Sequence, residues 1–84
     1  MTAMNIRVSF YSYFKDLTGC AEYTAVVPDG STLAALKSAL LTRFPGLHQF
    51  EKSMLTAVGV DYQGPGYLLQ PGDEVALFPP VQGG

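Results

Sequence analysis

A single apolar stripe with helical spacing constrains the fold of this chain more than any other feature of its sequence. Four leucines and a phenylalanine recur at intervals of one helical face, at Leu33, Leu36, Leu40, Leu41 and Phe44. Ser31 or Thr32 can cap the first turn of this helix, and Pro45 disfavours helical geometry at the residue before it. Because one amphipathic helix must bury its apolar face against another layer, we expect it to lie on a sheet.

Alternating apolar and polar residues predict strands on both sides of the helix, at residues 5–13, 22–27, 54–60 and 74–78. In the first strand Tyr11 falls on the side opposite Ile6, Val8 and Phe10, and in the last Phe78 falls opposite Val75 and Leu77. We expect a break at 15–19, an irregular connection at 47–52 and a loop at 61–66. Residues 67–69 are either a helical turn or an edge strand.

The chain of 84 residues is long enough for one domain, which we expect to span 1–84 with residues 1–4 as an N-terminal extension and 79–84 as a tail. The order of elements predicts an α+β fold in which the helix covers one face of a mixed sheet. Tyr11 and Phe78 then lie on the uncovered face. They form either an interaction surface or two scattered surface aromatics.

Charge and the content of cysteine and histidine exclude several classes of partner and site. Five basic and seven acidic residues give a net charge of −2 without a basic cluster, so we expect no nucleic-acid partner. One cysteine and one histidine, Cys20 and His48, cannot build a usual zinc or iron–sulfur site, and we expect no metal. The lone cysteine, and the lack of a signal peptide or membrane-spanning segment, favour a cytoplasmic protein with no membrane partner.

Familiar catalytic patterns are missing. A lone Cys20 and His48 are more often a buried thiol and a solvated imidazole than a catalytic pair. The 64–66 segment, Gly-Pro-Gly, is too short to cradle a phosphate and predicts a turn. Asp73 and Glu74 are neighbours on a strand and point to opposite faces, so we expect solvated charges and not an acid/base pair.

The C-terminal segment is the unusual feature, and it reads Phe78, Pro79, Pro80, Val81, Gln82, Gly83, Gly84. The prolines stiffen the chain into an extended path as it leaves the last strand. The two glycines carry no side chain, so the terminal carboxylate could pass through a channel too narrow for a residue with a Cβ. From the residues alone, a deliverable carboxylate and a frayed end are equally good interpretations.

The run from Gly72 to Val81 and the final Gly83 and Gly84, after an N-terminal strand and a Leu-rich helix, resemble the small subunit of molybdopterin synthase. The resemblance covers residues 4–84 and implies a ubiquitin-like β-grasp fold with a flexible Gly-Gly tail. It implies a sulfur carrier that binds no cofactor itself. An E1-like adenylating enzyme uses ATP and magnesium to adenylate Gly84, and a sulfur donor converts it to a thiocarboxylate.

The resemblance also implies how the sulfur is delivered. The tail, from Pro79 and Pro80 through Val81, Gln82 and Gly83, threads into the large synthase subunit, which holds the active site for the pterin substrate. Tyr11, Tyr62 and Phe78 match apolar positions that dock the carrier on its partner. Gln82 replaces a usual small residue, Gly59 a frequent asparagine, and the pair at 15–16 a commoner Arg-Glu. Residues 53–84 contain acidic residues and no Lys or Arg, which favours basic partner pockets.

Three alternatives to this function stay open. One is a sulfur carrier for another pathway, such as thiamine, a thiolated tRNA base or a tungsten cofactor. Another is a protein modifier joined to lysines through Gly84. The last is a ubiquitin-like binding module with an inert tail, which would keep its function without Gly83 and Gly84.

Overall fold

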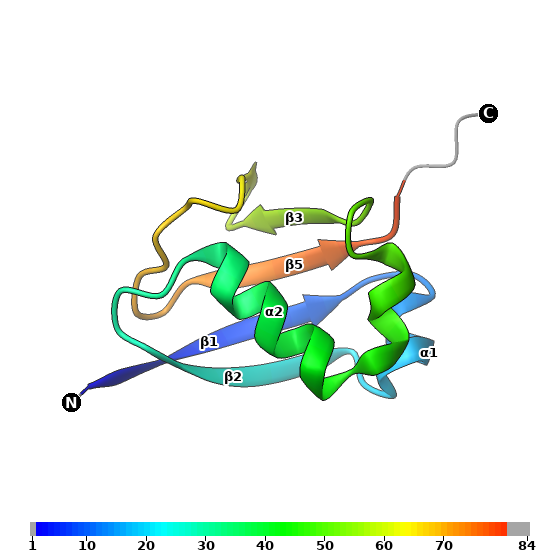
Figure 1. Cartoon of the computed structure of the whole chain (residues 1–84), viewed down its shortest axis with the longest axis horizontal. Coiled ribbons are helices and arrows are strands. Elements are labelled where there is room, and N and C mark those ends of the chain that lie inside the picture. The colour runs from blue at the N-terminus through cyan, green and yellow to red at the C-terminus, as the bar shows by residue number, and fades with distance from the viewer. Residues whose placement is uncertain (1, 81–84) are drawn as a thin grey trace.

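The computed structural model describes residues 2–80, which form a sheet with one long helix across it (Figure 1). The elements in chain order are β1 (Ala3–Phe10), α1 (Phe14–Thr18), β2 (Glu22–Pro28), α2 (Leu33–Arg43), the 3₁₀ helix η1 (Pro45–Phe50), β3 (Leu55–Val58), β4 (Asp61–Tyr62) and β5 (Glu74–Phe78). The five strands lie in the order β2-β1-β5-β3-β4. Because β1 and β5 are parallel and the other pairs antiparallel, the sheet is mixed and the α+β prediction is confirmed.

Helix α2 supplies the second layer of the core. It crosses the face of β1 and β5 (Figure 1), and its buried side chains are Leu33, Leu36, Leu40 and Leu41. On the sheet side, the buried residues of β1 are Met4, Ile6, Val8 and Phe10, and they belong to the same core. Burying one such side chain contributes about 1.5–3 kcal/mol. The predicted apolar stripe therefore holds the two layers together.

The ends of α2 follow the predicted signals. The Thr32 hydroxyl accepts a hydrogen bond from the Ala35 N–H at 3.2 Å, so Thr32 is the N-cap. The helix ends at Arg43, and Pro45 begins η1 in place of another α-helical turn. The Phe44 ring between them packs edge-on against Phe10 at 5.4 Å between centroids. The helix therefore ends where its last aromatic side chain enters the core.

The expectation that residues 1–4 form an extension is wrong for its last two residues. Ala3 pairs with Pro28 and Met4 with Val27, so both belong to β1. The Met4 side chain is only 4% exposed and lies in the core. Met4 continues the alternation of Ile6 and Val8, and this period places its side chain on the inner face.

Four short elements differ from the predictions. The break at 15–19 is largely helix α1, which begins at Phe14 and ends before Gly19, whose φ is 78°. The connection at 47–52 is largely η1, and the loop at 61–66 begins as β4. Residues 67–69 hold only a single-residue bridge between Leu68 and Thr32. The first strand also ends at Phe10 and not at 13. Segments of two to six residues are too short to show a period.

Candidate docking face and C-terminal exit

The sheet face opposite α2 carries the predicted interaction residues. Directly paired residues of neighbouring strands share a face, and β3 pairs with β5 through Leu55 with Phe78 and through Ala57 with Ala76. Ala57 also pairs with Tyr62 of β4. These side chains therefore lie opposite the buried Leu77 of β5, on the face that no helix within residues 2–80 covers (Figure 1).

Three aromatic rings meet on this face, and we call Tyr11, Tyr62 and Phe78 the aromatic cluster. Tyr11 stacks on Phe78 with ring centroids 4.7 Å apart and planes at 12°, while Tyr62 meets Phe78 edge-on at 6.3 Å and 71°. Tyr11 is 47% exposed and Tyr62 is 67% exposed, whereas Phe78 is half-buried between them. The structure thus brings together three residues widely separated along the chain, and their role in docking stays a prediction.

The backbone fixes the position of Tyr11 beside β5. Its N–H donates to the Leu77 carbonyl at 3.2 Å, one residue past the end of β1. This bond continues the parallel ladder between β1 and β5, so Tyr11 lies beside the last residues of β5. The stack with Phe78 follows from this register.

Sequence reasoning missed two apolar neighbours of the cluster. Leu55 is the cross-strand partner of Phe78 and is half-buried. Ala57 is 7% exposed although its register places it on the outer face, beside Tyr62. The sequence could have indicated both residues, because alternation within the predicted strand at 54–60 places Leu55 and Ala57 on one face and Thr56 and Val58 on the other. The uncovered face is therefore apolar beyond the three aromatic rings.

The chain leaves the sheet next to the aromatic cluster. Strand β5 ends at Phe78, and Pro79 and Pro80 follow in no regular element with half-exposed side chains. Proline has no N–H for a ladder hydrogen bond, so these residues cannot extend the strand in the usual way. The other predicted tail residues, Val81, Gln82, Gly83 and Gly84, lie outside the described residues.

The turn that leads into β5 is organised by one carboxylate. Asp73 accepts hydrogen bonds from the Gln70 N–H at 2.8 Å and from the Tyr67 hydroxyl at 3.1 Å. Desolvation, followed by the hydrogen bond and the charge of Asp73, raises the pKa of Tyr67 above its ordinary value. Glu74 instead approaches Arg7 at 3.6 Å, with both side chains largely exposed. Such a surface pair is weak. Both carboxylates thus have structural contacts of their own.

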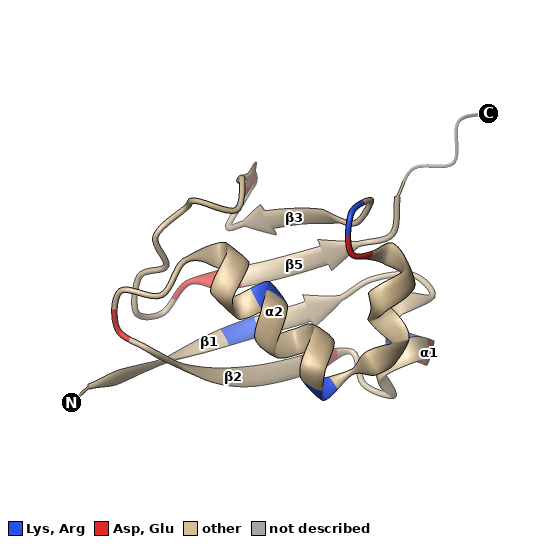
Figure 2. Cartoon of the chain, viewed as in Figure 1, with Lys and Arg blue, Asp and Glu red and all other residues tan. Residues whose placement is uncertain are grey.

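The charges are unevenly placed over the described part of the chain. Lys37 and Arg43 lie on α2, away from the uncovered face, whereas the charged residues of β3, β4 and β5 are acidic, namely Asp61 of β4 and Glu74 of β5 (Figure 2). Both acidic residues lie at the ends of their strands away from Phe78, and Glu74 faces Arg7 at 3.6 Å, so attraction of the exit to a basic partner pocket stays a prediction. Within residues 2–80, no helix has the length and hydropathy needed to cross a membrane.

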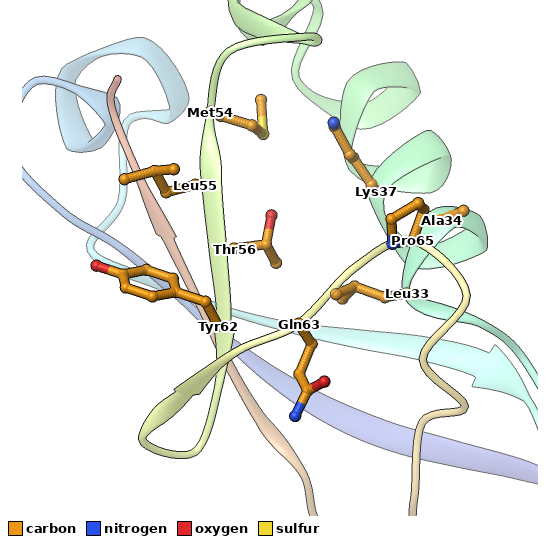
Figure 3. Close-up of a pocket in the computed structure, with 9 residues that line it drawn as sticks. All are labelled: Leu33, Ala34, Lys37, Met54, Leu55, Thr56, Tyr62, Gln63 and Pro65. Carbon is orange, nitrogen blue, oxygen red and sulfur yellow. The ribbon is translucent and has the colours of Figure 1, made fainter. Parts of the chain in front are cut away.

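A hollow of about 230 Å³ lies at the other side of β3, between this strand and α2. Figure 3 shows Lys37 and Tyr62 on opposite sides of the β3 ribbon, with Leu33 of α2 and Pro65 of the loop after β4 beside the hollow. Lys37 is the one charged group among its described lining residues. The other described lining residues are apolar or neutral, so the hollow holds no second charged side chain to pair with Lys37 in acid/base chemistry.

The fold and the exit define a class of protein. A mixed sheet with parallel central strands β1 and β5, crossed by one helix on one face, is the ubiquitin-like β-grasp fold. Small archaeal modifier protein 1 from Haloferax volcanii has this fold with a TM-score of 0.85, at 20% identity over 93% of this chain and 99% of the other. More narrowly, the model of the ThiS family matches residues 8–84, and the chain belongs to that family.

Two further proteins are similar to this chain, one in sequence and one in fold. The human molybdopterin synthase sulfur carrier subunit is 33% identical over 82 residues, which cover 94% of this chain and 93% of the human one. The resemblance stated from the sequence is thereby confirmed. The complex of subunits 1 and 2 of the molybdopterin-converting factor from Helicobacter pylori contains a chain with the same fold. Its TM-score is 0.67 at 23% identity, over 96% of this chain and all of the other.

Proposed function

We propose that this chain is the sulfur carrier subunit of a cytoplasmic molybdopterin synthase. The observation that carries the proposal is the aromatic cluster at the base of a two-proline exit that leads to Gly83 and Gly84. The named human relative, which aligns over nearly the whole chain, supports the same role. The docking face and the terminal group then serve separate tasks, binding the partner and carrying the sulfur.

The chemistry takes place at the Gly84 carboxylate. A carboxylate resists attack because its charge is delocalised and oxide is a poor leaving group. In an E1-like adenylating enzyme, a carboxylate oxygen attacks the α-phosphorus of magnesium-bound ATP and pyrophosphate leaves. A sulfide equivalent from the sulfur donor then attacks the carbonyl carbon, the bond to AMP breaks, and a thiocarboxylate remains. The difficult substitution is thus divided into two easier steps.

Delivery requires the large subunit of molybdopterin synthase. The aromatic cluster packs against this partner while the tail, from Pro79 to Gly83, holds the thiocarboxylate in the partner's active site. The pterin reaction belongs to that site, and this chain contributes the sulfur but no catalytic side chain. The subunit complex from Helicobacter pylori supports such a pairing, since one of its chains shares the fold.

Intact mass tests the proposed chemistry. The full chain is incubated with ATP, magnesium, sulfide and an adenylating enzyme proven active on another carrier, beside a chain that lacks Gly84. We expect a gain equal to replacing one oxygen by sulfur in the full chain alone. No gain in the full chain would overturn the carrier role and favour an inert tail.

Two additional readouts separate the remaining functions. Higher-mass adducts with lysine-containing proteins, and no thiocarboxylate, would favour a protein modifier. If the thiocarboxylate forms, the large subunit and the pterin precursor are added, and loss of the added sulfur mass is followed. A thiocarboxylate that persists with an active large subunit would place the carrier in another pathway, such as thiamine or tRNA thiolation.

A further inference from the structure

One residue beside the aromatic cluster has an unusual backbone conformation. Among residues 2–80, Ser12 is the single residue other than glycine with a positive φ, at 57°. This left-handed region is uncommon for a residue with a Cβ and is costly unless the surrounding structure requires it. The Ser12 side chain is exposed, so packing of the hydroxyl does not account for the conformation. The cause must lie in what the chain does on either side.

The segments before and after Ser12 are held on opposite sides of the sheet. Before it, Tyr11 is bonded to Leu77 and stacks on Phe78 on the uncovered face. After it, the chain enters α1 and places Phe14, which is fully buried, against Phe50 at 5.4 Å between ring centroids. The Phe14 N–H donates back to the Tyr11 carbonyl at 3.2 Å. The chain therefore reverses within two residues, and the left-handed Ser12 is the pivot.

We propose that Ser12 is a positioning residue, whose left-handed backbone holds Tyr11 against Phe78 and so shapes the docking face. If φ at residue 12 turns negative, the peptide between 11 and 12 rotates, and Phe14 and Tyr11 cannot both keep their places. Phe14 is the more strongly held, since full burial of an aromatic ring outweighs an exposed stack. Tyr11 therefore leaves Phe78. The effect of Ser12 on partner binding rests on the proposed function. The geometric half of the inference, that Ser12 holds Tyr11 against Phe78, does not.

The test replaces Ser12 by residues with different tolerance of the left-handed region. Gly and Asn adopt it readily, whereas Val does so rarely. Ser38→Val, on the exposed side of α2, is the matched control. For each variant we measure nuclear Overhauser contacts between the Tyr11 and Phe78 rings in the free chain. The affinity for the large subunit is measured by calorimetry.

For Ser12→Val we expect loss of the Tyr11–Phe78 contacts, retention of the Phe14–Phe50 contacts, and binding weakened by about tenfold. Ser12→Gly and Ser12→Asn should keep both contacts and affinity, as should Ser38→Val. If Ser12→Val does not fold, Ser12→Ala replaces it, and its ring contacts and affinity must then be lower than those of both the parent and Ser12→Asn.

Other outcomes overturn the inference in distinguishable ways. Ring contacts that survive in Ser12→Val, or that vanish in Ser12→Gly, show that Ser12 does not position Tyr11. Lost contacts with unchanged affinity show that the aromatic cluster is not the docking face, so Ser12 has no part in binding. If even the parent chain does not bind the large subunit, the proposed partner is wrong, and the ring contacts in the free chain still decide the geometric half.

Discussion

The ring of Tyr11 lies flat against that of Phe78, with centroids 4.7 Å apart and planes inclined by 12°. The pair joins the end of β1 to the end of β5, the strand that leads into the exit. Tyr62, on β4, contacts the Phe78 ring edge-on. Phe78 is therefore the central member of the aromatic cluster, and the cluster lies directly before Pro79 and Pro80.

Replacement of the central ring should impair partner binding more than stability. We expect Phe78→Ala to weaken binding to the large synthase subunit by about 30-fold, the loss typical of a central aromatic anchor. Stability should fall by only about 1–2 kcal/mol, because the half-buried Phe78 ring loses its contacts with Tyr11 and Tyr62. Calorimetric titration and urea unfolding measure the two effects. Leu68→Ala is the control, since Leu68 is 57% exposed outside the cluster. Unchanged affinity of Phe78→Ala would contradict the docking role.

The hydrogen bond between Tyr67 and Asp73 predicts a pH dependence of stability. Because the folded chain raises the pKa of Tyr67 from 10.0, the folded state holds this proton more tightly than the unfolded state. The contribution is fully present below pH 10.0 and is lost as the pH rises through the folded pKa. We expect Tyr67→Phe to be less stable than the parent at pH 8, and the difference to shrink above pH 10.

Urea unfolding of parent and variant across this range measures that difference. A difference between Tyr67→Phe and the parent that stays constant from pH 8 to pH 11 would show that Asp73 does not hold the Tyr67 proton.

The turn between β3 and β4 predicts which residues can replace Gly59. Val58 pairs with Asp61, so only two residues connect the strands, and Gly59 has φ of 64°. No atom lies within 4 Å of a Cβ added there, so backbone conformation alone sets the cost. We expect Gly59→Ala to lower the free energy of unfolding by about 1–2 kcal/mol and Gly59→Asn by much less.

Gly64→Ala is the matched control for Gly59, because Gly64 has no positive φ and an added Cβ meets nothing within 4 Å. It should be neutral or slightly stabilising. Equal effects of alanine at both positions in urea unfolding would refute the conformational explanation of Gly59.

The apolar stripe of α2 predicts a large loss of stability on truncation. Leu36 is 0% exposed at the centre of the helix. We expect Leu36→Ala to lower the free energy of unfolding by about 2–5 kcal/mol, from lost transfer energy and the cavity left behind. Thermal and urea unfolding measure the loss, with Ser38→Ala on the exposed side of α2 as the control. A loss below about 1 kcal/mol would mean that α2 is not the main cover of the sheet.

Elements that are long enough to repeat a period could be predicted from the residues alone. The helix stripe from Leu33 to Phe44 and the alternation in β1 and β5 predicted two layers, and they correctly placed Tyr11 and Phe78 on the uncovered face. The α+β class follows from these elements, since a single helical face and several half-buried strands have few ways to bury their apolar sides. The prolines after Phe78 are likewise a local signal.

Which of these faces come into contact depends on how the strands pair in the folded chain. Tyr62 reaches Phe78 because β4 pairs with β3 and β3 with β5, and pairing between strands distant in sequence is set by long-range packing. The same holds for the burial of Met4 between the layers and for the bond from Tyr67 to Asp73. The left-handed Ser12 has no signature in local propensity. It arises because Tyr11 and Phe14 are held on opposite sides of the sheet, and that constraint exists only once the chain has folded.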